Sequence, residues 1–372
     1  MKRLLWIGLL AATASFAFEA PVGLRSPKGL LMGDAWTAIN TDEYTLFYNP
    51  ASLGRHSRDF TFYPFNPQVT GTNLISDLDR FEDFPSTPNG AADVLMNYPV
   101  HVGTNIVPGF KLFNFGFSFI ANEQADLLLR NKIHPTLDID YRSDRGFVAG
   151  FAIPLGPGRL NGKSTSGQQT TFGISGKYIK RRGIYDAYAL TGTDLLDIIN
   201  DTGDAKDIVE RLGGVQGDGW GFDAGLEHVV RRGANQWVVG VSALDIADTD
   251  FDVPTNVNNR VVAPNRSQVN VGASWMFRSN LLKGTLSADV RDLTEERELM
   301  ERFRFGAEIG FSALSVLGGI NSGYFSYGVA LDMGLMKLIG GFYGVEVGGA
   351  YRRTQSKRFI LYLSLFDFSF DA

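Results

Sequence analysis

The chain has 372 residues, a formal net charge of −5 and no cysteine. That length allows either two or three soluble domains or one large barrel. The net charge is slightly negative and no long basic run occurs, so we expect no nucleic-acid partner. The lack of cysteine excludes disulfides and thiolate metal sites. The 43 glycines, 28 phenylalanines and 13 tyrosines are typical of a transmembrane β-barrel, with an ordinary all-β secreted protein as the alternative.

The N-terminus has the pattern of a secretory signal peptide, which we place at residues 1–17. Lys2 and Arg3 form a basic start, an apolar run follows over 4–16, and Ser15-Phe16-Ala17 is a small-x-small cleavage site. Beyond it, no stretch of about 18 apolar residues could form a membrane-spanning helix. An exported chain of this kind can span a membrane only as a closed barrel.

Residues 33–54 form the most distinctive stretch, GDAWTAINTDEYTLFYNPASLG. Small residues come first, an acidic pair (Asp42, Glu43) follows, and the stretch ends in FYNPASLG. Pro50 fixes its own φ and biases Asn49 toward an extended conformation. These features predict a compact wedge of short helix and turn. The simpler alternative is a plain turn before the first strand.

After this wedge, alternation of polar and apolar residues dominates the chain. The clearest case is 302–311, where Arg304 and Glu308 alternate with Phe305, Ile309 and Phe311. Such segments predict about 14 antiparallel strands, at 58–65, 98–107, 110–121, 143–155, 170–182, 219–230, 236–246, 267–277, 284–293, 302–312, 315–322, 324–333, 337–352 and 357–370.

The predicted connections alternate in length. Long ones fall at 66–97, 122–142, 183–218 and 247–266, whereas short ones include Pro108-Gly109 and 231–235. Short turns on the periplasmic side and long loops outside are typical of an outer-membrane barrel. The polar stretch 156–169 is an exception, because it is long on the side where turns should be short.

The small-residue run, the acidic pair and "FYNPASL" together resemble the N-terminal hatch of the FadL superfamily of outer-membrane β-barrels, which includes PorV-type, TraF-like and UPF0164-type proteins. The resemblance implies a hatch at 18–57 inside a transmembrane barrel at 58–372, in a bacterial outer membrane and in contact with its lipid. The hatch residues would be Phe47, Tyr48, Asn49, Pro50, Ala51 and Leu53.

Catalytic chemistry has little support in the sequence. The four histidines (His56, His101, His134, His228) are scattered without metal-ligand spacing. No Gly-x-Ser-x-Gly, His-Glu-x-x-His or phosphate-loop motif occurs. We therefore expect neither an enzyme nor a metal or other cofactor.

Two further groups of residues are candidates for function. The alternation directs one group into the lumen, either as a gate that moves or as a static network holding the hatch: Lys177, Asp223, Glu227, Asp289, Arg291, Arg304 and Glu308. The other group is apolar and is expected on outer loops that carry helical insertions, where it binds a ligand, grips a partner or caps the barrel. It consists of Leu74, Leu78, Phe81, Leu127, Leu128, Leu129, Leu195 and Ile199.

Two functions follow from the resemblance. The first is a passive uptake channel for hydrophobic small molecules such as long-chain fatty acids, entering above the hatch and leaving when it shifts. The second is a PorV-like barrel that transports nothing and instead binds secreted proteins or scaffolds an envelope complex. The first is favoured because a hatch is a costly feature in a barrel that conducts nothing, which is an argument from analogy.

Overall fold

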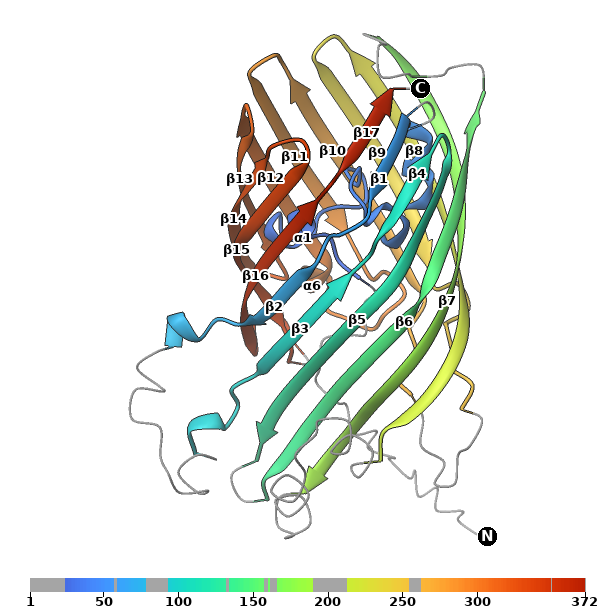
Figure 1. The fold of residues 1–372 in the computed structure, drawn as a ribbon. Coiled ribbons are helices and arrows are strands. Elements are labelled where there is room, and N and C mark those ends of the chain that lie inside the picture. The colour runs from blue at the N-terminus through green and yellow to red at the C-terminus, as the bar shows by residue number, and fades with distance from the viewer. Residues whose placement is uncertain are drawn as a thin grey trace, which may run out of the picture.

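The computed structural model describes residues 24–56, 59–77, 93–131, 134–156, 160, 166–189, 213–253, 262–348 and 350–371. Their strands pair antiparallel into one closed sheet (Figure 1). The strands are β1 (Asp59–Tyr63), β2 (Gln68–Thr72), β3 (Val100–Ile106), β4 (Gly109–Leu112), β5 (Phe115–Arg130), β6 (Thr136–Leu155), β7 (Ser166–Ala189), β8 (Val215–Arg232), β9 (Asn235–Leu244), β10 (Gln268–Arg278), β11 (Leu282–Val290), β12 (Phe303–Phe311), β13 (Leu314–Asn321), β14 (Tyr324–Asp332), β15 (Met336–Glu346), β16 (Gln355–Leu365) and β17 (Phe368–Asp371).

These segments make a barrel of 14 strands, as predicted. β1 and β2 are successive parts of the first barrel strand, β3 and β4 of the second, and β16 and β17 of the last. The barrel closes where the last strand meets the first, through β16 with β2 and β17 with β1. The chain's C-terminal end lies at the rim where the short turns gather (Figure 1). Because every strand has two neighbours, the sheet has no open edge.

Side chains alternate across the wall, as the sequence predicts. On β12, Arg304 and Glu308 are buried, whereas Phe305, Ile309 and Phe311 are 48%, 71% and 59% exposed on the outside. Large apolar side chains are exposed in the same way on most other strands. A closed barrel with an apolar outer face and a polar interior is the outer-membrane type of fold. No helix among the described residues is long and apolar enough to cross a membrane.

The predicted turn at Pro108-Gly109 is wrong. The reversal between the second and third barrel strands lies at Phe113 and Asn114, where Phe113 has a φ of 53°. Pro108 instead interrupts the second strand, because proline has no N–H to give to the ladder. A proline marks a turn only where the strand itself ends. Here the second barrel strand continues beyond Pro108 as β4.

The long loop predicted at 122–142 is also wrong. β5 and β6 continue as paired strands to Arg130 and from Thr136, so Leu127, Leu128 and Leu129 lie on a strand. The stretch contains several charged residues (among them Asp126, Asp138 and Arg142) that hide the alternation. Those charges are buried in ion pairs, so they remain compatible with a strand.

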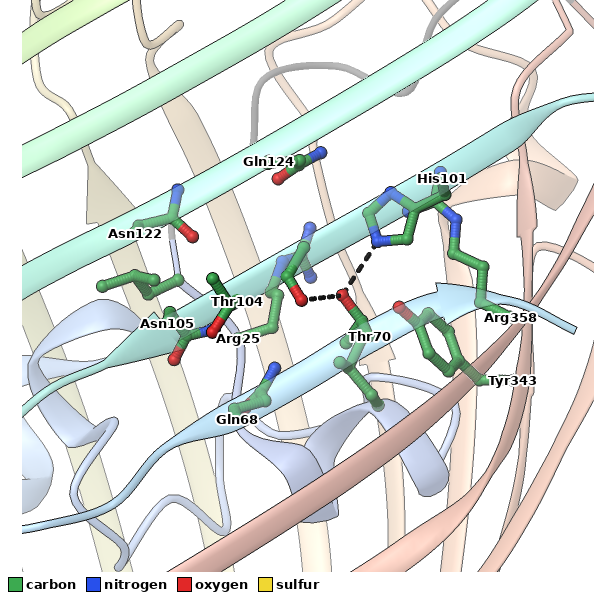
Figure 2. A pocket seen from close by; sticks show the side chains of 13 residues that line it. Arg25, Gln68, Thr70, His101, Thr104, Asn105, Asn122, Gln124, Tyr343 and Arg358 are labelled. Atoms are coloured by element: carbon green, nitrogen blue, oxygen red, sulfur yellow. Dashed lines mark hydrogen bonds between the residues drawn. The ribbon is translucent and has the colours of Figure 1, made fainter. Parts of the chain in front are cut away.

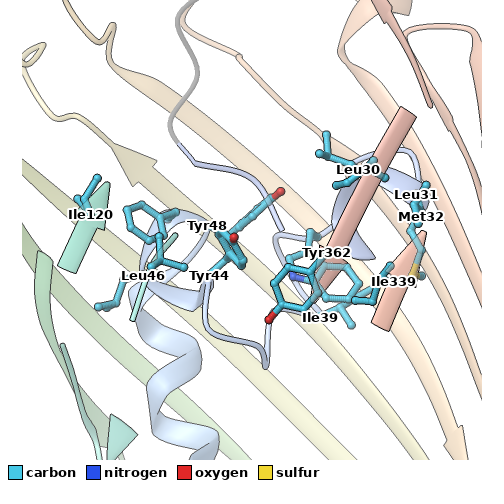
Figure 3. Packing of buried hydrophobic residues seen from close by; sticks show 14 of the residues in the cluster. Leu30, Leu31, Met32, Ile39, Tyr44, Leu46, Tyr48, Ile120, Ile339 and Tyr362 are labelled. Atoms are coloured by element: carbon cyan, nitrogen blue, oxygen red, sulfur yellow. The ribbon is translucent and has the colours of Figure 1, made fainter. Parts of the chain in front are cut away.

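The hatch, residues 24–56 of the structure, lies inside the barrel (Figures 1 and 3). It contains α1 (Pro27–Leu31), η1 (Thr45–Phe47) and η2 (Pro50–His56). Ser26 caps α1 by accepting from the Gly29 N–H at 3.1 Å, and Pro27 occupies the first helical position, which lacks a partner for its N–H in any helix. Two further short helices are η3 (Leu74–Asp77) and α6 (Leu299–Arg302), both in connections at the rim opposite the short turns.

Candidate functional site

The hatch is the apolar core of the barrel. Its largest buried side chains pack together and against wall residues such as Ile120, Ile339 and Tyr362 (Figure 3). The predicted hatch residues Phe47, Tyr48, Asn49, Pro50, Ala51 and Leu53 are all buried. This segment therefore occupies the interior of the barrel and packs against its wall.

Wall glycines provide the surface on which the hatch sits. A Cβ added at Gly173 would lie 2.6 Å from Ala51 Cα, and one at Gly225 would lie 3.0 Å from Asn49 Cγ. The same crowding against hatch atoms occurs at Gly116, Gly150, Gly306, Gly319, Gly328 and Gly341. Only glycine lets the hatch backbone approach the wall this closely. These wall glycines thus leave the space that the hatch occupies in the lumen.

Asp34 anchors the first part of the hatch. Its carboxylate accepts from Arg291 Nη1 at 2.7 Å and from the Tyr48 hydroxyl at 2.6 Å, and it also pairs with Arg25. The Arg291 guanidinium lies 5.0 Å from the centre of the Tyr48 ring. Burial raises the pKa of the Tyr48 hydroxyl, whereas the two arginines act in the opposite direction. Asp289, near the end of β11, accepts from the Thr37 N–H at 2.8 Å.

Glu227 anchors the second part. It accepts from Ser52 Oγ at 2.5 Å and lies 2.9 Å from Arg55 Nε. Both members of this ion pair are buried, with side-chain exposures of 0% for Glu227 and 9% for Arg55. Asn49 supports the same turn, because its Oδ1 accepts from the Ala51 N–H at 3.0 Å. This contact gives the Asn-Pro-Ala sequence its structural role.

Glu43 lies in the middle of the hatch and accepts a hydrogen bond from the Tyr362 hydroxyl. Burial raises the pKa of the Glu43 carboxyl, and the neighbouring Asp42 raises it further, while Lys337 lowers it. Lys111 Nζ donates to Thr45 Oγ1 at 2.9 Å in the same region. The acidic pair of the sequence is therefore part of the hatch–wall contact.

The predicted lumen residues divide into two groups. Four contact the hatch: Glu227, Asp289, Arg291 and Glu308, the last through Lys28 at 3.4 Å. The other three pair among wall and loop residues: Lys177 lies 2.8 Å from Asp223 and 2.9 Å from Asp245, and Arg304 lies 3.9 Å from Asp292. The predicted lumen residues thus form ion pairs and hydrogen bonds both with the hatch and within the wall, and charges of both signs take part.

The apolar residues predicted for loops are not brought together as one site. Leu74 is 50% exposed at the start of η3, whereas Leu128 and Leu129 are buried on β5. Leu127 packs near the buried Ile139 and Ile184. The remaining four, Leu78, Phe81, Leu195 and Ile199, lie outside the described residues.

A polar cavity of about 70 Å³ lies beside the hatch (Figure 2). Leu24, Arg25 and Leu30 of the hatch form one side, and the wall supplies the rest: Gln68, Thr70, His101, Gly103, Thr104, Asn105, Asn122, Gln124, Tyr343 and Arg358. No pattern in the sequence indicates this group. Its members come from five strands, so no local motif exists, and only the inward alternation of each strand could have indicated them.

The wall is interrupted close to the hatch. Between β1 and β2 the chain reads Pro64-Phe65-Asn66-Pro67, and opposite it Val107 and Pro108 separate β3 from β4. The Asn66 side chain closes this wall break: its Nδ2 donates to Val107 O at 3.0 Å, and its Oδ1 accepts from Val107 N at 2.9 Å. One side chain thus replaces the missing ladder between the first two barrel strands.

No group of three or more His, Asp or Glu within the described ranges could hold a metal ion.

The fold and the hatch together define the class of this protein, a 14-stranded outer-membrane-type barrel whose N-terminal segment lies in its interior. No protein-family model matches the sequence, and no curated protein matches it. Solved structures do. The toluene transporter TbuX of Ralstonia pickettii is 11% identical with a TM-score of 0.40, over 92% of this chain and 98% of its own.

Two other solved structures are similar. The monoaromatic hydrocarbon channel CymD is 10% identical with a TM-score of 0.43, over 95% of this chain and 100% of its own. A FadL homologue of Pseudomonas aeruginosa is 10% identical with a TM-score of 0.29, over 95% of this chain and 99% of its own. At these values the similarities assign no ligand or role, and the barrel itself is established by the strand pairing of this chain.

Proposed function

We propose that this protein is a passive outer-membrane channel for small hydrophobic molecules, in which the hatch is the movable part. One observation carries the proposal. The hatch contributes no strand to the sheet among the described residues, and side-chain packing and a limited set of polar contacts hold it in the lumen. It can therefore shift without breaking the hydrogen-bonded ladder of the wall.

The wall break supports a sideways exit for such a molecule. On its inner side the buried Val107 belongs to the same apolar cluster as Tyr44 and Phe47 of the hatch. On the outer side Phe65 and Phe366 are 44% and 59% exposed. An apolar molecule released beside the hatch would thus meet apolar surface on both sides of the wall. Only the side-chain contacts of Asn66 replace the ladder at this level between the first two barrel strands.

A disulfide that locks the hatch to the wall tests whether the hatch must move. A Cβ built at Gly272 would lie 2.9 Å from Thr37 Cβ and still closer to Asp289 Oδ1. The usual disulfide spacing between Cβ atoms is about 3.8 Å, so the two backbones must move apart and the Asp289 side chain must rotate for the bond to form. The native chain has no cysteine, so Thr37→Cys with Gly272→Cys introduces a single defined pair. Uptake of a radiolabelled long-chain fatty acid is measured in cells that lack their own channel for it.

We expect the oxidised double variant to lose uptake and to regain it with reductant, while the single variant Thr37→Cys transports normally in both conditions. Equal uptake by the locked and reduced forms would show that transport does not need the hatch to move. Absence of uptake in the native protein as well would remove fatty acids as the cargo.

A second function has one observation in its favour. β5, β6, β7 and β8 have 16, 20, 24 and 18 residues, whereas β9 and β11 have 10 and 9. The four long strands extend the wall well beyond its other side (Figure 1). Such a projecting sheet suits a barrel that binds a secreted protein or scaffolds an envelope complex. A stoichiometric protein partner on gently purified barrel, lost when 131–135 is shortened, would favour this role.

A further inference from the structure

Thr70, His101 and Asp126 form a hydrogen-bonded series at the polar cavity. Thr70 Oγ1 lies 2.9 Å from His101 Nε2, and His101 Nδ1 lies 2.7 Å from Asp126 Oδ1 (Figure 2 shows the first contact). All three residues are buried. A hydroxyl next to an imidazole that a carboxylate orients is the arrangement of nucleophile, base and positioning group in acyl-transfer enzymes.

The Asp126 carboxylate determines which ring nitrogen of His101 accepts a hydrogen bond. Asp126 takes hydrogen bonds from Gln124 Nε2 at 2.6 Å and from Arg358 Nη2 at 3.0 Å, and these contacts fix it as an ionised acceptor. An acceptor at Nδ1 requires a proton there, so in the neutral ring Nε2 is the acceptor and faces Thr70. The backbone of His101 is fixed as well, since its N–H donates to Thr72 Oγ1 at 2.6 Å.

The strand register brings these residues together, and a glycine makes room for the contact. Gly103 pairs with Thr70 across β2 and β3, and Asp126 pairs with His101 across β3 and β5. A Cβ at Gly103 would lie 2.7 Å from Thr70 Oγ1 and 3.4 Å from His101 Nε2. Any larger residue at position 103 would therefore separate the hydroxyl from the imidazole.

The cavity gives the pair a place for a substrate. Thr70 and His101 line it directly, together with the side-chain amide of Asn122 and with Arg25 and Arg358, which also pair with Asp34 and Asp126. Positive charge and amide donors stabilise the oxyanion that forms when a hydroxyl adds to an ester carbonyl. The volume of about 70 Å³ suits a short acyl group.

We propose that Thr70 and His101 are the nucleophile and base of an esterase site for short acyl esters. His101 Nε2 takes the hydroxyl proton as Thr70 Oγ1 bonds to the ester carbonyl carbon. The bond to the leaving alkoxide then breaks, and His101 returns the proton to it, releasing an alcohol. Water attacks the acyl-threonine, again through His101, and releases the acid while restoring the Thr70 hydroxyl. Asp126 positions the ring.

The test uses the purified, folded full chain in detergent with p-nitrophenyl acetate as substrate. We expect Thr70→Val and His101→Gln to reduce hydrolysis to the rate of heat-unfolded protein, and Thr70→Ser to retain it. Asp126→Asn should lower the rate about 100-fold and move the rising limb of the pH–rate profile downward, since the imidazolium loses its partner. A purely structural role of Asp126 would leave that profile in place.

The chain offers its own control pair. Thr170 Oγ1 lies 2.8 Å from His228 Nδ1, but the pair sits on the exposed face of the barrel. Thr170→Val should therefore hydrolyse the ester as the native protein does.

A fluorophosphonate probe gives a second readout that needs no variant, because mass spectrometry locates its adduct in the native chain. An adduct on Thr70 supports the site. Native protein that forms no Thr70 adduct and hydrolyses the ester no faster than Thr70→Val, with both folded by heat-shifted gel mobility, overturns it.

Discussion

Gly173→Ala is the substitution that most directly tests how the hatch is held. Its Cβ would lie 2.6 Å from Ala51 Cα and under 3.0 Å from other backbone atoms of residues 50 and 51. Backbone cannot rotate away as a flexible side chain does, so the docked hatch must shift. Overpacking of this kind costs about 1–3 kcal/mol. The hatch can leave while the wall stays paired. We therefore expect the substitution to make the free energy of hatch docking less favourable and to leave strand pairing in the wall unchanged.

A cost of that size lowers the ratio of docked to undocked hatch by about 5- to 150-fold. Trypsin cleavage after Arg55 reports this ratio, since Arg55 is buried against Glu227 only while the hatch is docked. The control is Gly284→Ala, where an added Cβ meets nothing within 4 Å. Equal cleavage rates in the two variants, with the barrel folded in both, would refute the idea that wall glycines seat the hatch.

Three further predictions concern the contacts of the hatch. Asn49→Ala removes the acceptor of the buried Ala51 N–H and should weaken docking by about 1–3 kcal/mol, seen as faster cleavage after Arg55. Glu227→Gln leaves Arg55 without its buried partner and should cost about 3–5 kcal/mol in the same assay, whereas Glu123→Gln, in an exposed pair with Arg145, should change little. Docking should also depend on pH through Glu43. Because burial raises the pKa of its carboxyl in the docked hatch, docking is most favourable at acidic pH and weakens as the pH rises through that raised pKa. Current through planar bilayers should increase with pH accordingly, and Glu43→Gln should make it less dependent on pH.

Local patterns predicted much of the fold. The alternation of Arg304 and Glu308 with Phe305 and Ile309 is enough to predict β12. One face of this strand meets the polar lumen, and the other meets the apolar surroundings of the barrel. The prediction failed at Pro108, which breaks a strand without turning the chain, and at 122–142. There, charges buried in ion pairs replace the apolar residues that normally indicate a buried face.

The site was predictable only in part. The polar lumen residues could be named because alternation directs Glu227 and Arg291 inward, but their partners in the hatch could not. The Ser52–Glu227 contact spans 175 residues, and the Tyr362–Glu43 contact spans 319. The Thr70–His101–Asp126 series depends on strand register across β2, β3 and β5, which no single segment encodes.

The seam of the barrel has a consequence for how the protein assembles. The wall closes only when β1 and β2 pair with β17 and β16, which join residues about 300 positions apart, such as Thr70 with Ile360. Contacts of such long sequence separation form late and slowly. The hatch lies directly before β1 in the chain and packs inside the wall that this last pairing closes. The segment that fills the interior is therefore tethered to the seam, so closing the wall also holds this segment close to the lumen in which it packs.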